Sequence, residues 1–599
     1  MGGAVYIGDN AFVRIIDSSF TNNKADYGGA LYLGKGSETQ IIADKKNISI
    51  KGNMASDGRG AGIYIDDALL RLQANAKRKI TIDDTINGVG NIETFGNVIF
   101  SKQAEFDETI IISPTGDGTL QLENEEALNA RRINMGGSTL STANNSIKTL
   151  SLKSLTLADN TKSNVVIDAS LKSGTSDKIT AETVEGTGVL NVSAINLTSD
   201  SKTPVDIPVG EDSLVSEMSA TKAETAQATY KLKASLDSNG YLMARAYGQK
   251  AKPCTMAAPV AAQIGGYLTQ INSYDQAFMN MDMNMLKTRE ERQAEEMANR
   301  YALQVESGKW KVESDFLSYN SQNSALHYDN GINRNGKGLW TRPYVTFERV
   351  NLSGGPKVGN IAYGNFFGGD AGIKQLRNGW KRQFSAYVGY NGSTQDFNGQ
   401  SVDQNGGTIG VTEVWYKNNF FTGLTANVSA NAVNSSTDLG HENFPMLMAG
   451  IASKTGYNFE FRGKWLSRHD SSVIVQPSLL LSYSFVHTFA HNNGAGNRVS
   501  SSPLHAIQVA PGIKAIFNLP KGWQPYLGIN MRWNIIDKTH FNLPDVSIPD
   551  MSINPYVEYG VGLQRKWGER FTGFGQAMIR NGGRNGIMLS FGFKWAIGK

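Results

Sequence analysis

The feature that most constrains the fold of this chain is a set of long strands, each with one apolar and one polar face, in the segment 335–599. Pro525 to Ile535 shows the pattern, because apolar and polar or small residues alternate along it. Strands of soluble sandwiches are usually about five or six residues long. Strands near ten residues with one polar face suit a tilted crossing of lipid around a wet lumen. The apolar positions of the example are Leu527, Ile529, Met531, Trp533 and Ile535, and the others are Tyr526, Gly528, Asn530, Arg532 and Asn534.

Twelve such strands can be traced, an even number as bacterial single-chain barrels require. A lumen of twelve strands is wide enough for one helix. The sequence therefore predicts a 12-stranded transmembrane β-barrel over 335–599. The strands are expected near 338–350, 361–376, 381–392, 405–417, 419–434, 446–462, 472–489, 503–518, 523–536, 550–567, 570–580 and 586–597.

The first part of the chain carries a repeat. The segment Gly2–Ile7 (GGAVYI) returns as Gly28–Leu33 (GGALYL), and a weaker copy is Gly60–Ile65 (GAGIYI). Repeats of about 20–50 residues built from short strands indicate stacked coils, in which each coil buries its apolar face against its neighbours. Asn residues at equivalent turns can then form a ladder from coil to coil. We expect a β-solenoid (β-helix) over 1–250, with a sandwich of ordinary strands as the alternative.

The segment 251–334 is expected to join these two domains. Pro253, Pro259 and small residues are typical of a linker over 251–265. Ser273 and Gln276 have the spacing of a capping box, and good helix formers follow, without Pro or Gly, to about Gln304. Such a helix would span about 45 Å. Because charged residues surround it between 287 and 300, we expect it inside a polar lumen, and a soluble interdomain helix is the alternative.

Composition limits the possible functions. Lys and Arg total 58 against 54 Asp and Glu, a net charge of +4 that gives no reason to expect a nucleic-acid partner. The single Cys254 rules out an internal disulfide and a thiolate zinc site. No long apolar run predicts a transmembrane helix, and no signal peptide opens the sequence at Met1. The repeat is already under way at Met1, so we expect an exported chain to have a signal peptide upstream of this sequence.

We find no pattern that predicts catalysis. No His precedes His327, so no Ser–His pair can form in the first domain, and Gly210–Leu214 carries an extra Glu compared with a Gly-Asp-Ser-Leu esterase motif. The sequence therefore predicts no catalytic residue, no cofactor and no metal ligand. We expect the chain not to be an enzyme.

Several of these motifs resemble one family. The GGA-[VL]-Y repeats are similar to those of adhesin-type autotransporter passengers and of chlamydial polymorphic membrane proteins. The segments 173–190 and 230–242 resemble the late passenger region, which often acts as a folding nucleus. Gly338–Tyr344 and Arg580–Gly586 look like landmarks of the autotransporter β-domain, and Gln263–Arg289 resembles the helix that plugs it.

The resemblance implies type V secretion. The barrel would lie in the outer membrane of a Gram-negative-type bacterium, and it would anchor its own passenger and translocate it to the cell surface. The passenger would be an adhesin for a host or cell-surface receptor. Rival hypotheses are a porin-like channel and an export module for an enzyme encoded before Met1.

Two further features follow from the resemblance. The aromatic last strand, 586–597, resembles the signal read by the barrel-assembly machinery, although the family usually ends on Phe or Trp and this chain continues to Lys599. Some family members cleave themselves at an Asn–Asn pair in the plug helix. This chain has Met279-Asn280-Met281 near that position, which makes Asn280 the candidate cleavage residue.

Overall fold

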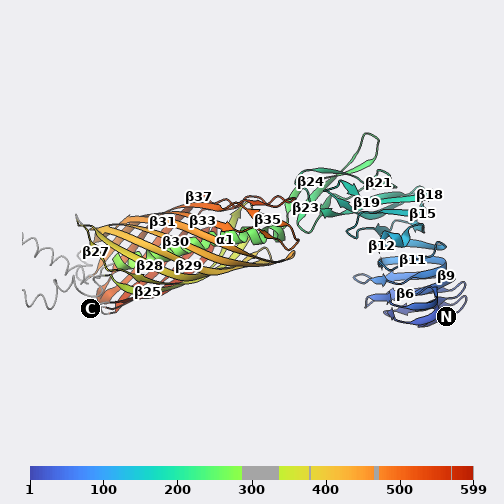
Figure 1. Ribbon diagram of the computed structural model, residues 1–599, viewed down its shortest axis with the longest axis horizontal. Helices are drawn as coiled ribbons and strands as arrows, with labels where there is room; N and C mark the ends of the chain where they lie inside the picture. Colours follow the sequence, from blue (N-terminus) through green and yellow to red (C-terminus); the bar gives the residue numbers. More distant parts are fainter. Residues whose placement is uncertain (286–335, 377–378, 464–470, 568–569, 598–599) are drawn as a thin grey trace, which may run out of the picture. The chain divides into compact units, whose positions relative to one another are not determined.

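The computed structural model describes residues 1–285, 336–376, 379–463, 471–567 and 570–597. It divides into two compact units (Figure 1). The first comprises Met1–Lys252 with Asp545–Ser547, and the second comprises Pro253–Pro544 with Ile548–Lys599. Each unit is described by itself.

In the first unit, equivalent strands of successive repeats pair in parallel. β1 (Val5–Ile7) pairs with β5 (Leu31–Leu33), which pairs with β9 (Ile63–Ala74), so that Tyr6, Tyr32 and Tyr64 are in register. The three rings form a stack, with ring centroids 5.2 Å and 5.6 Å apart. The predicted stacking of the repeats is therefore confirmed, and the parallel sheet agrees with a β-helix. Figure 1 shows these strands as a ladder of arrows.

Most other strands of this unit extend the stacks of parallel strands, and β4 (Lys24–Tyr27) and β8 (Met54–Arg59) pair in parallel as a separate two-stranded sheet. The others are β2 (Phe12–Ile16), β3 (Phe20–Thr21), β6 (Glu38–Ala43), β7 (Ile48–Lys51), β10 (Ile80–Ile82), β11 (Ile86–Phe100), β12 (Ile110–Leu122), β13 (Arg132–Met135), β14 (Thr139–Ser141), β15 (Thr149–Leu157), β16 (Lys162–Ser170), β17 (Thr175–Ser176), β18 (Lys178–Glu185), β19 (Val189–Ser199) and β21 (Val215–Met218). Of these, β17 is antiparallel to its neighbour β16.

A ladder of polar side chains runs between the coils. Asn23 Nδ2 donates to Asn53 Oδ1 at 2.8 Å, and Asn53 Nδ2 donates to Asp84 Oδ2 at 2.6 Å. Asn53 is 4% exposed, so its side chain hydrogen-bonds to residues of the coils on either side instead of to water. The predicted Asn ladder is confirmed, and it fixes the register of the coils.

The first unit ends in antiparallel strands. They are β20 (Val205–Pro208), β22 (Lys222–Glu224), β23 (Ala228–Leu236) and β24 (Leu242–Ala251). β23 pairs with both β22 and β24, and β20 pairs with the other edge of β24. Tyr230, Leu232 and Ala244 are buried on one face of this sheet. The opposite face is exposed.

The second unit is a closed barrel of twelve antiparallel strands, as predicted. β25 pairs with β26 on one side and with the last strand, β42, on the other, which closes the ring. In ring order the strands are β25 (Gly338–Ser353), β26 (Lys357–Asp370), β28 (Lys381–Phe397), β29 (Gln400–Lys417), β30 (Phe420–Thr437), β31 (Gly440–Tyr457), β33 (Ser472–Thr488), β36 (Leu504–Asn518), β37 (Trp523–Ile536), β40 (Tyr556–Trp567), β41 (Phe571–Gly582) and β42 (Arg584–Ala596). Short strands lie beside their ends, namely β27 (Lys374–Gln375), β32 (Phe459–Phe461), β34 (His491–Asn492), β35 (Arg498–Ser501), β38 (Phe541–Asn542) and β39 (Ser552–Ile553).

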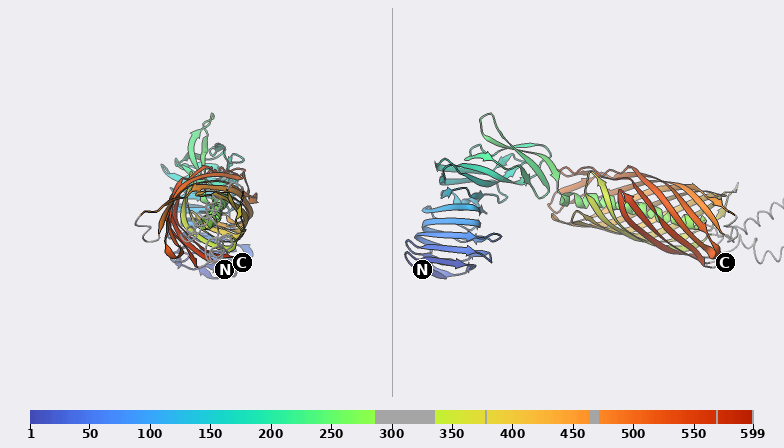
Figure 2. Two further views of the ribbon diagram at one scale, coloured as in Figure 1. Left: turned by 90° about the vertical axis from the view of Figure 1, so that its left-hand side faces the viewer. Right: turned by 180° about the vertical axis from the view of Figure 1, so that it is seen from behind.

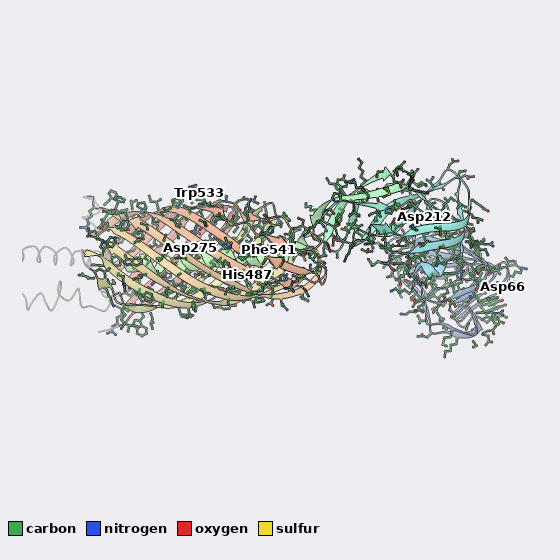
Figure 3. The ribbon with its side chains drawn as sticks, turned by 45° about the horizontal axis from the view of Figure 1, so that its top comes forward. Asp66, Asp212, Asp275, His487, Trp533 and Phe541 are labelled. Carbon is green, nitrogen blue, oxygen red and sulfur yellow. The ribbon has the colours of Figure 1, made fainter. Side chains whose placement is uncertain are left out.

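The two faces of the barrel strands point as predicted. In β37, Leu527 is 51% exposed and Trp533 is 40% exposed, whereas Arg532 is 4% exposed. Trp533 projects from the outside of the wall in Figure 3. In this strand, apolar side chains face outward and polar side chains face the lumen, which is the arrangement for a wall between lipid and a polar interior.

The predicted start of the helix was wrong. Helix α1 is Pro253–Met285, so it starts about twenty residues before the predicted cap and takes in the predicted linker. Ser273 does not cap it, because its hydroxyl donates to Thr269 O at 2.9 Å inside the helix. Pro253 is tolerated because the N–H of a first-turn residue has no partner within the helix. Residues 286–304, with the charges that suggested a lumen, lie outside the described residues.

No helix in the described part of the chain is long and apolar enough to cross a membrane.

Candidate functional site: the barrel lumen and its helix

Helix α1 occupies the barrel lumen. The end-on view in Figure 2 shows the helix inside the ring of strands. Near the start of the helix, Gln263 Nε2 donates to Ser502 O, which precedes β36, at 3.0 Å. Near its other end, Asn280 contacts Asp370, the last residue of β26. The helix thus runs along the lumen from one end of the strands toward the other.

Two glycines let the helix pass close to the wall. A Cβ on Gly265 would lie 1.9 Å from Gln395 Nε2 and 2.3 Å from Gln404 Nε2. A Cβ on Gly266 would lie 2.9 Å from the sulfur of Met446. Glycine usually weakens a helix by about 1 kcal/mol relative to alanine. A larger side chain at either position would have to push aside the ends of the Gln395, Gln404 or Met446 side chains.

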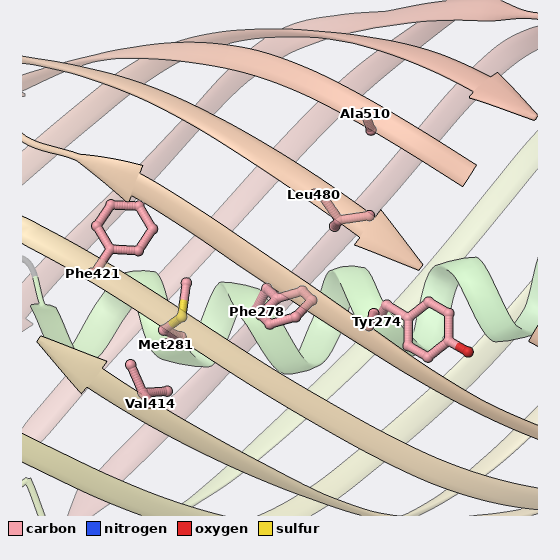
Figure 4. Packing of buried hydrophobic residues seen from close by; sticks show 8 residues of the cluster. Tyr274, Phe278, Met281, Val414, Phe421, Leu480 and Ala510 are labelled. Carbon is pink, nitrogen blue, oxygen red and sulfur yellow. The ribbon is translucent and has the colours of Figure 1, made fainter. Parts of the chain in front are cut away.

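An apolar cluster forms the next contact (Figure 4). On α1, Tyr274, Phe278 and Met281 project toward β29, β30, β31, β33 and β36. Tyr274 also donates its hydroxyl to Tyr483 O at 2.9 Å, so its buried polar atom is satisfied. The wall side chains of the cluster are Val414, Phe421, Ala452, Leu480 and Ala510.

Two acidic residues of α1 bind basic residues of the wall. Asp275 accepts from Arg532 at 2.8 Å, and Asp282 accepts from Lys454 at 2.8 Å and from Lys514. Seven residues separate the two carboxylates, about two helical turns, so both lie on one face of the helix. Figure 3 places Asp275 within the lumen. Neither carboxylate is more than 14% exposed, so each depends on its cations for stability.

The Arg532 contact belongs to a larger network on the wall. Glu558 accepts from Arg532 at 3.0 Å and from Arg580 at 2.7 Å, and Glu348 accepts from Arg584 at 2.6 Å. Alternating signs give each buried charge an opposite neighbour, which offsets the cost of removing it from water. Asp275 of α1 joins this network through Arg532.

A third face of α1 contacts the seam where β25 meets β42. The register of the seam passes from Thr341↔Phe593 to Tyr344↔Ser590 and skips Arg342 and Pro343, and proline has no N–H to donate. Ser590 Oγ donates to Gln276 Oε1 of the helix at 2.9 Å. The helix therefore binds the wall where the backbone ladder is interrupted.

Asn280, the predicted cleavage residue, lies beside this seam and is 2% exposed. Its Nδ2 donates to Asp370 Oδ1 at 2.6 Å, and its Oδ1 accepts from Arg342 at 3.1 Å. Asp370 also accepts from Trp340 Nε1 at 2.9 Å, from Ser385 and from Lys594. Both the nitrogen and the oxygen of the Asn280 amide are therefore hydrogen-bonded. These contacts do not test whether the chain is cleaved at Asn280.

Sequence reasoning placed a helix in the lumen but missed the residues that hold it there. The signal was present, because Lys454, Lys514 and Arg532 occupy lumen-facing positions of their strands. Asp275 and Asp282 of α1 complete these pairs. The predicted helix began at Ser273, which left out the first part of α1 with its small residues. Among the described residues, no group of three or more His, Cys, Asp or Glu is arranged to hold a metal ion.

Comparison with known proteins agrees with this geometry. A family model described as the autotransporter beta-domain matches residues 339–577. No curated protein matches the chain.

Among solved structures, the transport unit of the autotransporter AIDA-I from Escherichia coli is 18% identical, with a TM-score of 0.40, over 43% of this chain and 90% of that one. The β-domain of the Bordetella autotransporter BrkA is 15% identical, with a TM-score of 0.35, over 44% and 99% of the two chains. The translocator domain of NalP from Neisseria meningitidis is 13% identical, with a TM-score of 0.34, over 47% and 96%.

Residues 339–577 are therefore an autotransporter β-domain, and the barrel to which they belong lies in the outer membrane of a bacterium.

Proposed function

We propose that the barrel anchors and translocates the first unit, which is its passenger, and that the passenger acts as an adhesin at the cell surface. The observation that supports translocation is the path of the chain. β24 ends at Ala251, α1 begins at Pro253, and α1 runs along the lumen toward the end where β25 begins. A chain in this arrangement threads its own barrel.

The surface of the passenger supports adhesion. Stacked coils present columns of outward side chains, such as Glu38, Arg71 and Glu93, in which Arg71 Nε binds Glu93 at 2.7 Å. Repetitive columns of this kind offer many equivalent contacts to a partner. The test compares bacteria that display the full chain with bacteria that carry residues 253–599 only. Equal binding of both to a host-cell monolayer, with both barrels assembled, would remove adhesion as the function.

The alternative of a porin-like channel makes a different prediction for the lumen. The cavity beside Asp275 and Asp282 has a volume of only about 70 Å³, because α1 and its side chains occupy the lumen there. We therefore expect the full chain in a planar bilayer to show far smaller single-channel conductance than the same barrel without α1. A large and steady conductance of the full chain would favour the channel.

We also propose that the last strand directs assembly by the barrel-assembly machinery. In β42, Phe591, Phe593 and Trp595 are 55%, 46% and 62% exposed and face outward. Changing all three to Thr keeps the strand propensity and removes the aromatic surface. Assembly in cells should then fall, while folding of the purified variant from urea into detergent should persist. Loss of both would assign these residues to folding instead.

Cleavage at Asn280 is a second candidate function. The specific observation is that Asp370 accepts a hydrogen bond from the amide nitrogen that would attack the carbonyl carbon of Asn280. Mass spectrometry of the assembled wild-type chain and of Asn280→Ala tests it. An intact wild-type chain would exclude self-cleavage, and a product ending at residue 280 that the variant lacks would support it.

A further inference from the structure

The outward face of the sheet β22–β23–β24 gathers positive charge. Lys222 lies opposite Lys231, and Lys233 lies opposite Arg245. All four side chains are exposed. Tyr247 lies opposite Lys231 on the same face and is 37% exposed. These five residues are termed the basic face.

The charge of this face contrasts with that of the unit that carries it. Residues 1–252 contain 26 Lys and Arg against 30 Asp and Glu, a net charge of −4. Arg245 has one carboxylate near it, Asp206 at 3.5 Å. Among the described residues, no carboxylate lies within 4.0 Å of Lys222, Lys231 or Lys233, which is the distance criterion for an ion pair.

Like charges on directly opposed residues of an antiparallel pair destabilise a sheet. The sequence places two such pairs side by side in a unit whose net charge is negative. Their repulsion is relieved when a negatively charged partner lies across the sheet. The face is therefore arranged for an anion that extends over more than one strand.

We propose that the basic face binds a sulfated polysaccharide. This inference rests on the proposed adhesin function, because it names the class of receptor. Sulfate groups spaced along a flexible chain can reach lysines on neighbouring strands, and the flat ring of Tyr247 can pack against an apolar sugar face between them. Single-stranded nucleic acids bind to grooves with several stacking aromatic residues. The basic face is a sheet surface with one tyrosine, which favours the polysaccharide.

The test uses the full chain in detergent micelles and immobilised heparin as the probe. Changing Lys222, Lys231 and Lys233 together to Ser should weaken binding by about tenfold, because each exposed ion pair contributes only modestly. Wild-type binding should weaken in 0.5 M salt, on the order of tenfold, because exposed charges are screened. Desulfated heparin, which keeps only its carboxylates as anionic groups, should bind far more weakly.

The matched control changes three exposed lysines elsewhere in the same unit, Lys35, Lys45 and Lys46, to Ser. It should bind heparin as the wild type does. The basic-face variant should also resist urea at least as well as the wild type, because repulsion is removed, and a less stable variant would mean that these lysines serve the fold.

Three outcomes of the binding measurements would overturn the inference. They are equal loss of binding in the control, unchanged binding in the basic-face variant, and tighter binding of single-stranded DNA than of heparin. Adhesion of the displayed chain to cells stripped of sulfate by sulfatase separates the two proposals. Undiminished adhesion there would leave the adhesin function standing without this receptor class.

Discussion

Lys454 on β31 donates to Asp282 on α1 at 2.8 Å, and this ion pair joins the barrel wall to the helix in the lumen. The Lys454 side chain is 10% exposed and that of Asp282 is 9% exposed. Lys514 on β36 donates to the same carboxylate. One acidic side chain thus fixes the helix to two strands of the wall at a defined depth.

Changing Asp282 to Asn should loosen the helix in the lumen. The substitution leaves two buried ammonium groups without their counter-charge, and breaking a buried ion pair costs about 3–5 kcal/mol. Water is then expected to enter around Lys454 and Lys514, so single-channel conductance in a planar bilayer should rise and fluctuate. Hydrogen exchange of α1 should quicken at the same time.

A surface ion pair of the same barrel provides the control. Glu413 accepts from Arg382 at 2.9 Å, and the two side chains are 30% and 43% exposed. Glu413→Gln should change stability by less than about 1 kcal/mol and leave conductance unchanged. If Asp282→Asn behaves in the same way, the lumen ion pair does not hold the helix.

Gly450 and Tyr274 should show strong coupling in a double-mutant cycle. A Cβ on Gly450 would lie 1.7 Å from the hydroxyl oxygen of Tyr274 and 2.8 Å from Tyr483 O. We expect Gly450→Ala to destabilise the barrel by about 1–3 kcal/mol, because the tyrosine must move. The same change should cost less in a Tyr274→Phe background, since the nearest atom is gone. Urea unfolding of the four proteins in vesicles measures the coupling, and additive effects would contradict this packing.

A charge on the outer face should cost more at the middle of a strand than at its end. Val428 is 48% exposed and lies at the centre of β30, whereas Ser436 is exposed near its end. Val428→Arg should destabilise the barrel by about 2–4 kcal/mol in lipid, and Ser436→Arg by about 0–1 kcal/mol. Equal and small costs at both positions would mean that this surface faces water.

The stability of the passenger should depend on pH through Asp177. This carboxyl is 1% exposed, and burial raises its pKa to about 7 although Thr142 donates to it at 2.6 Å. The folded state then keeps a proton that the unfolded state loses near pH 4. The free energy of unfolding should therefore fall by about 1.4 kcal/mol per pH unit between about pH 4 and pH 7, and this contribution should level off above that range.

Pulse proteolysis of the passenger in urea at pH 5.0 and pH 7.5 measures this difference. It should be smaller in Asp177→Asn, which has no proton to lose. Asp117→Asn changes an exposed aspartate of the same unit and should keep the wild-type difference. An unchanged difference in Asp177→Asn would show that other groups govern the pH dependence.

The barrel was predictable because the alternation of apolar and polar residues within each strand shows which side chains face lipid and which face the lumen. Alternation along β37 and β42 assigns every side chain to lipid or lumen without reference to any other strand, and strand length distinguishes a membrane wall from a soluble sheet. The stacked repeats were predictable for a similar reason, since Tyr6, Tyr32 and Tyr64 mark equivalent positions.

The helix start and the lumen contacts were not predictable in this way. Pro259, Gly265 and Gly266 lower the helix propensity of 253–266, and only the surrounding wall makes a helix the favourable state there. The partners of Asp275 and Asp282 lie more than 170 residues away in the chain. Such pairs form only once the strands have closed into a ring, and the arrangement of that ring cannot be read from a local sequence pattern.

The junction between β24 and α1 has a mechanical consequence. Lys252 alone separates the end of the last passenger strand from the first helical residue. A pull on the first unit would therefore reach the helix without first stretching a flexible linker. Asp275 and Asp282 would then both resist the sliding of α1 out of the barrel, because the same movement along the axis breaks both of their ion pairs.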